Sequence, residues 1–156
     1  MWIKAHNHIT QRQAKKIAHH SHGGEQMDTR LKESEWIILQ ALWQESPLDL
    51  KGIIASVQAL NPTVTWDYKT YHSFLRILLE KGLITAQRQK SSNRYSPAIT
   101  RDEALSCEAE SLISRRSYFG SVSSIMVHMA QQGQLTREEK QELRLLAEQL
   151  SREEEE

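Results

Sequence analysis

The stretch between Thr65 and Gly82 restricts the possible folds more than any other part of the sequence. Its apolar residues recur every three or four positions, the spacing of one face of an α-helix. They are Tyr71, Phe74, Leu75, Leu78 and Leu79. The helix is expected to run to Lys81, because Gly82 stands where a left-handed residue usually ends a helix. The remaining positions are mostly polar, so the sequence predicts an amphipathic helix with one solvent-facing arc.

Two further helices are predicted before this one, and a short hairpin after it. Residues 31–45 and 49–60 carry apolar side chains at helical spacing, and Asp49 can cap the second of these helices. Residues 83–88 and 93–96 are strand-like pieces on either side of a polar turn. Three helices followed by a basic hairpin is the order of elements in a winged helix-turn-helix.

The C-terminal part of the chain predicts three more helices. A capping box at Thr100 opens a helix that is expected to continue to about residue 119. A helix over residues 121–132 follows, and a second capping box at Thr136 opens the last one. From Ser151 onward we expect a frayed acidic end.

These C-terminal helices carry apolar stripes but are too few to close a core alone, since a lone domain below roughly 60 residues is marginally stable. We therefore expect them to bury the stripes against a second copy of the chain. Packing back onto the N-terminal domain is the alternative. The expected dimerisation residues are Phe119, Val122, Ile125, Met126, Met129, Leu143 and Leu146. The predicted fold class is mostly α, a winged helix-turn-helix followed by a helical dimerisation domain.

The expected domain boundaries follow from these elements. Residues 1–26 hold five of the seven histidines and no clear apolar period. We interpret them as a disordered leader or tag, with a native basic arm or a metal-binding tract as alternatives. Residues 27–99 form the predicted DNA-binding domain, residues 100–152 the dimerisation domain and residues 153–156 an acidic tail.

Charge is distributed unevenly along the chain, although the net charge is +0. Between Trp66 and Arg101 there are seven basic residues and two acidic ones. Between Gly133 and Glu156 there are four basic residues and eight acidic ones. A basic middle and an acidic end imply that only the middle faces a polyanion.

Several classes of protein are disfavoured by the sequence. No apolar run approaches the ~18 residues that cross a bilayer, and the N-terminus has no signal-peptide core, so a cytoplasmic protein without membrane insertion is expected. No phosphate-binding glycine loop, HExxH motif or nucleophile elbow is present. The single cysteine, Cys107, has acidic neighbours that raise a thiol pKa, so it is interpreted as structural. We expect no enzymatic activity, cofactor or bound metal.

The candidate DNA-binding residues lie on the third helix and on the hairpin. Short or forked polar side chains on the arc opposite the apolar face suit base edges and phosphates in a major groove about 12 Å wide. These are Lys69, Thr70, His72, Ser73 and Arg76. Trp66 either anchors the helix start in the core or wedges against the groove edge. Arg88, Lys90 and Arg94 surround the hairpin turn and are expected to contact the DNA backbone.

Several of these motifs together resemble the penicillinase repressor family (BlaI/MecI/CopY type). The resemblance runs from about Leu31 to Leu150. It rests on Glu35-Trp36 with Leu42-Trp43, on Trp66-Asp67-Tyr68-Lys69-Thr70, and on Glu80-Lys81-Gly82-Leu83-Ile84. It implies a homodimeric transcriptional repressor on a palindromic double-stranded DNA operator.

Two departures from the family pattern concern the inducing signal. The copper branch uses paired C-terminal cysteines, whereas this chain has only Cys107. The beta-lactam branch is cleaved by a protease at an Asn-Phe bond, and the matching pair here, counted from Gly120, is His128-Met129. A regulatory protease thus stays unidentified. A winged-helix adaptor for other proteins and a metal-responsive regulator remain alternative functions.

Overall fold

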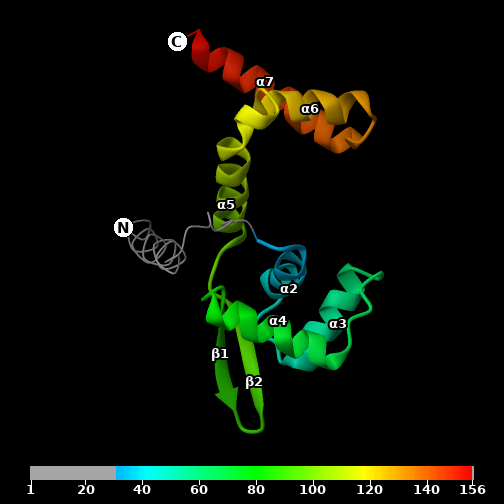
Figure 1. The fold of residues 1–156 in the computed structure, drawn as a ribbon, viewed down its shortest axis with the longest axis vertical. Coiled ribbons are helices and arrows are strands. Elements are labelled where there is room, and N and C mark those ends of the chain that lie inside the picture. The colour runs from blue at the N-terminus through cyan, green and yellow to red at the C-terminus, as the bar shows by residue number, and fades with distance from the viewer. Residues whose placement is uncertain (1–30, 156) are drawn as a thin grey trace. The chain divides into compact units, whose positions relative to one another are not determined.

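The computed structural model describes residues 31–155, in two compact units that meet between Ser111 and Leu112 (Figure 1). The leader interpretation of residues 1–26 lies outside the described residues. The first unit contains α2 (Glu33–Gln44), α3 (Leu50–Leu60), α4 (Tyr68–Glu80), β1 (Ile84–Gln89), β2 (Ser92–Pro97) and most of α5 (Arg101–Ser114). The second contains the short 3-10 helix η1 (Arg116–Tyr118), α6 (Val122–Gln131) and α7 (Arg137–Glu154). This order confirms the predicted fold class.

Two aspartate side chains mark where α3 and α4 begin, and a glycine marks where α4 ends. The Asp49 carboxylate accepts a hydrogen bond from the backbone N–H of Gly52 at 2.8 Å, and Asp67 accepts one from Thr70 at 2.8 Å. Each bond satisfies an N–H that has no partner within its helix. Gly82 has a φ of 71°, the predicted left-handed geometry that ends α4.

The core of the first unit lies among α2, α3 and α4. It is built mainly from aliphatic side chains at helical spacing, together with two tyrosine rings. The largest fully buried members are Tyr71, Ile38, Leu39, Leu42, Ile53, Leu75, Leu78 and Val57. Burying one such aliphatic side chain contributes about 1.5–3 kcal/mol to folding. The core therefore fixes which face of α4 points inward and which stays in solvent.

The hairpin is antiparallel, with Ile84 opposite Pro97 and Gln89 opposite Ser92. Its turn is tighter than the four polar residues expected from the sequence, because the strands continue to Gln89 and from Ser92. Lys90 occupies this turn with a φ of 47°. The hairpin lies against α4, as Figure 1 shows in green for both elements.

The base of the hairpin is fastened to the loop between α2 and α3. Leu48 donates its backbone N–H to the Tyr95 carbonyl at 3.0 Å, and the Tyr95 N–H donates back to Leu48 at 2.8 Å. Both side chains are buried. This two-bond bridge holds the hairpin against the three-helix core.

A tryptophan joins α2 to the segment that leads into α5. The Trp43 indole N–H donates to the Ile99 carbonyl at 2.8 Å, and the Trp36 ring packs edge to face against Trp43 with centroids 5.8 Å apart. The next residue, Thr100, accepts the N–H of Glu103 at 3.1 Å through its hydroxyl, half of the predicted capping box.

The helices around the second unit differ from the expectation in two places. α5 ends at Ser114 instead of near residue 119, and η1 fills the interval before Gly120. The predicted fraying from Ser151 is wrong, because α7 continues to Glu154. The Ser151 hydroxyl donates to the Ala147 carbonyl at 2.9 Å, and Arg152 supplies a positive charge near the negative helix end. Both capping-box bonds at Thr136 are present, at 2.7 and 3.1 Å.

Across residues 31–155 we find no helix that combines the length and apolar character needed to cross a membrane.

Candidate nucleic-acid interface

The outward arc of α4 carries the polar side chains that the sequence predicted for DNA contact. Lys69, His72, Ser73 and Arg76 are exposed, whereas Tyr71 and Leu75 on the opposite side are buried. The four exposed residues recur at spacings of three and four, which places them along one side of the helix. The core therefore leaves this arc free for a ligand outside the unit.

Thr70 differs from its neighbours because it is half-buried and takes part in capping α4. Hydrogen bonds from the Thr70 side chain and from its backbone N–H hold the pKa of the Asp67 carboxyl below its ordinary value. Asp67 is thus kept charged at the positive end of α4. Thr70 lies at the edge of the arc and orders the first turn of the helix.

Trp66 lies against the core, in line with the first of its two predicted roles. Its ring packs edge to face on Phe74, with centroids 4.8 Å apart, and on Tyr71, with centroids 5.3 Å apart. Trp66 is half-buried. Aromatic pairs in this geometry contribute about 0.5–1.5 kcal/mol beyond their burial. Trp66 therefore fixes the direction in which the chain enters α4.

The three basic residues of the hairpin are not equivalent. Arg88 and Lys90 are exposed near the turn, but Arg94 is half-buried. The Nε atom of Arg94 is covered and has no hydrogen-bond partner among residues 31–155. Arg94 pairs with Gln87 across the strands, so it stands further from the turn than Arg88. The freely accessible positive charge of the hairpin is thus at Arg88 and Lys90.

The sequence reasoning missed one exposed aromatic residue on α4. Tyr68 is 59% exposed, and its ring meets His72 edge to face with centroids 4.7 Å apart. The signal was the spacing of four residues from Tyr68 to His72 and on to Arg76, which puts the three in one row.

In the second unit, the predicted dimerisation residues form an uncovered apolar face. No side chain of α6 or α7 is buried, and Met126, Met129 and Leu146 are 39%, 36% and 48% exposed. Phe119, Val122, Ile125 and Leu143 are half-buried. Other large apolar residues of the unit, missing from the prediction, are equally open: Ile113, Tyr118, Val127, Leu145 and Leu150.

Features that could support other chemistry are few among the described residues. Burial, followed by the charges of Glu110, Glu103 and Glu108, raises the pKa of the Cys107 thiol. Within residues 31–155, no three His, Cys, Asp or Glu side chains are grouped to hold a metal ion.

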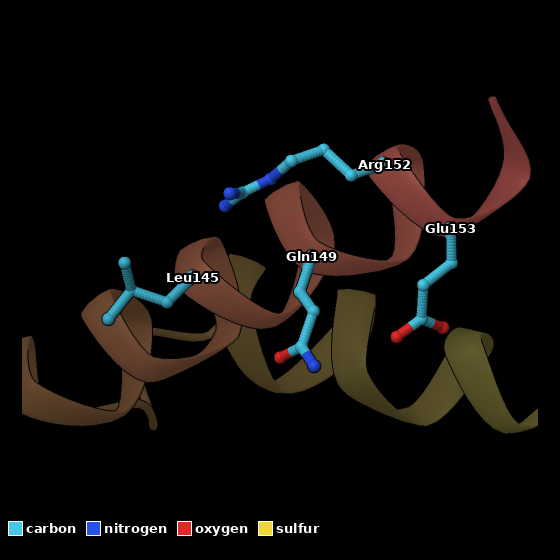
Figure 2. Close-up of a pocket in the computed structure, with 4 residues that line it drawn as sticks. All are labelled: Leu145, Gln149, Arg152 and Glu153. Carbon is cyan, nitrogen blue, oxygen red and sulfur yellow. The ribbon is translucent and has the colours of Figure 1, made fainter. Parts of the chain in front are cut away.

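One pocket lies along α7, where it is lined by Leu145, Gln149, Arg152 and Glu153 (Figure 2). Its volume is about 480 Å³. All four lining residues belong to the same helix, so none of them closes the pocket from an opposite side. The pocket is therefore an open depression along α7.

A comparison with known families identifies the group to which this fold belongs. The penicillinase repressor family matches residues 31–149, which extend from before α2 into the last turns of α7. The chain belongs to the penicillinase repressor family. The resemblance inferred from the sequence motifs is confirmed.

A sequence relative agrees with this membership of the penicillinase repressor family. A penicillinase repressor from Bacillus licheniformis is 25% identical over 114 residues, which cover 73% of this chain and 86% of that protein. A similar solved structure is the solution structure of monomeric Bacillus licheniformis BlaI in complex with the blaP half-operator. It has a TM-score of 0.39 and 23% identity, covering 47% of this chain and 87% of the other.

Proposed function

We propose that this member of the penicillinase repressor family is a homodimeric transcriptional repressor that binds a palindromic operator in double-stranded DNA. The observation that carries the proposal is the exposed polar arc of α4 beside a hairpin with two accessible cations. A major groove is about 12 Å wide and admits a helix of this kind, and a basic hairpin suits the flanking phosphates. Family membership supports the same conclusion.

The exposed side chains divide into two roles by their chemistry. Arg76 presents a planar guanidinium that can donate two hydrogen bonds to guanine, and His72 and Ser73 offer further polar atoms to base edges. Lys69, near the start of α4, contacts phosphate, as do Arg88 and Lys90 on the hairpin. Trp66 and Thr70 support this surface by fixing the helix start, and the half-buried Arg94 adds a third cation of the hairpin that faces the DNA backbone.

The uncovered apolar face of the second unit supports assembly with a second copy of the chain. Its exposed methionine and leucine side chains are numerous enough that leaving them in water would be costly. A two-fold symmetric dimer presents two α4 helices in opposite directions, and this matches an inverted repeat. The expected distance between half-sites is one DNA turn, about 34–36 Å, or a multiple of it.

The proposed function involves no catalytic step. The bond at which a regulatory protease would act by analogy, His128-Met129, lies inside α6 and both residues are exposed. Release from DNA by cleavage there would require local unfolding of that helix.

Fluorescence anisotropy tests the proposal directly. A labelled duplex from the promoter of the protein's own or neighbouring gene is titrated with the full chain, and a scrambled duplex of equal length is the control. We expect at least about a thousandfold preference for the promoter duplex, the lower range for specific over non-specific binding. Equal affinity for both duplexes would contradict sequence-specific repression.

A further inference from the structure

Tyr68 is an exposed aromatic residue at the first position of α4, beside the arc assigned to DNA. It is 59% exposed, whereas Tyr71 on the same helix is buried and Phe74 is half-buried. Its ring lies against His72, with centroids 4.7 Å apart and planes inclined by 75°. A large ring in this position loses favourable burial.

The start of α4 does not need Tyr68 for its stability. Trp66 already anchors the helix start on Tyr71 and Phe74, and Asp67 already caps the backbone N–H of Thr70. These contacts complete the hydrophobic and hydrogen-bonding requirements of a helix N-terminus. Within residues 31–155 the ring contact of Tyr68 is with the exposed His72, so most of its ring is open to a ligand outside the chain.

The neighbouring ring limits the freedom of Tyr68. An edge-to-face contact favours one arrangement of the two side chains, so less conformational entropy is lost when a ligand binds. Tyr68, His72 and Arg76 also form one row along the helix, because they are four residues apart. The row begins at the N-terminal end of α4, the part of a recognition helix that contacts base edges.

The apolar ring of Tyr68, held against His72, favours one of the four bases. In the major groove only thymine presents a methyl group, and an apolar side chain that contacts this methyl distinguishes thymine from the other bases. We propose that Tyr68, oriented by His72, is a specificity-determining residue that contacts the methyl group of a thymine in each operator half-site. This inference rests on the proposed function, and it adds a residue that no sequence pattern had assigned.

The first experiment determines where the thymine lies. The full chain and its Tyr68→Ala variant each select binding sites from a random 30-base-pair duplex library. We expect the wild type to select an inverted repeat with a fixed thymine in each half. The variant should select the same repeat with that position relaxed. An unchanged thymine preference in the variant would overturn the inference, even though specific DNA binding itself were confirmed.

The second experiment removes only the methyl group. Uracil replaces the selected thymine in each half-site, and anisotropy gives the dissociation constant of both proteins for both duplexes. Burying one methyl-sized group corresponds to about a fourfold change in affinity per half-site. We expect this loss with the wild type and no loss with Tyr68→Ala. Equal losses for the two proteins would refute the contact.

Two matched variants separate the contact from a general loss of apolar surface. Tyr68→Phe keeps the ring and should keep the sensitivity to uracil. Leu60→Ala shortens a 41% exposed side chain at the end of α3 and should leave both dissociation constants unchanged. Loss of uracil sensitivity in Tyr68→Phe would show that the hydroxyl acts instead of the ring face, and the proposal would fail. If the wild type selects no sequence at all, the proposed function fails as well.

Discussion

The carboxylate of Glu35, in the first turn of α2, is paired with the ammonium group of Lys81 at the C-terminal end of α4. The Glu35 side chain is only 4% exposed, whereas that of Lys81 is 41% exposed. The same carboxylate accepts the backbone N–H of Lys32 at 3.1 Å. One buried charge therefore joins the start of the first described helix to the end of the helix assigned to DNA.

Removing Lys81 should destabilise the first unit more than an ordinary surface substitution. Lys81→Met leaves the buried Glu35 carboxylate without its positive partner, and we expect the free energy of unfolding to fall by about 1–3 kcal/mol. Urea denaturation followed by circular dichroism measures the change, at equal protomer concentration because a dimer's stability depends on it. The double variant Glu35→Gln/Lys81→Met should recover part of the loss. A double variant less stable than Lys81→Met would contradict the pairing.

Lys90 should contribute to DNA binding through its positive charge, because its backbone geometry suits other residue types better than lysine. Its φ of 47° lies in the left-handed region, which Gly and Asn adopt more easily than Lys. We expect Lys90→Asn to preserve or raise stability by up to about 1 kcal/mol but to weaken DNA binding. The slope of log affinity against log salt should fall by about 1. Lys90→Arg keeps the charge and should keep the slope; a slope unaffected by Lys90→Asn would remove Lys90 from the interface.

Arg76 and Lys90 should affect DNA binding in different ways. Arg76→Ala removes a base-reading group on α4 and should cost about 1–3 kcal/mol on the operator while changing non-specific binding little. Lys90→Ala removes a phosphate contact and should weaken binding to operator and scrambled duplexes alike. For each variant, anisotropy gives the dissociation constants for the operator and for the scrambled duplex, and the ratio of these two constants is compared. Equal ratios for the two variants would refute this division of roles.

The uncovered face of the second unit should be the site of dimerisation. Leu146 is 48% exposed on α7, so Leu146→Asp should leave the helix content of the protomer unchanged while placing a charge in the proposed interface. Sedimentation equilibrium should show a dissociation constant of the dimer at least about tenfold higher. Leu60→Asp, a substitution of a similarly exposed leucine on α3, is the control. A fully dimeric Leu146→Asp protein would place the interface elsewhere.

Cys107 should react slowly with electrophiles at neutral pH. Burial and the nearby carboxylates raise its thiol pKa, so the thiol stays protonated, and the reactive thiolate forms only at higher pH. The rate of alkylation by iodoacetamide should rise with a midpoint above the value of about 8.5 for a free thiol. Glu110→Gln removes one of the charges and should lower the midpoint. A midpoint below that of free cysteine would contradict the electrostatic account of this side chain.

The sequence predicted elements well where the signal is local. The apolar spacing of α4, the caps at Asp49 and Thr136 and the left-handed Gly82 depend on residues within a few positions of one another, and the structure contains all of them. The end of α5 and the extent of α7 were predicted less well. Both depend on weak balances at helix ends, where the last turn forms or frays for small differences in free energy.

For the candidate interface, the sequence determined by itself that one arc of α4 is polar and that a cationic hairpin follows it. Helical periodicity and local charge are sufficient for that much. Only the tertiary structure decided that Arg94 is half-buried, that Trp66 packs against the core and that Tyr68 stays exposed. The reason is physical: which polar or aromatic side chain remains available depends on partners from other elements and on the space that the folded core leaves.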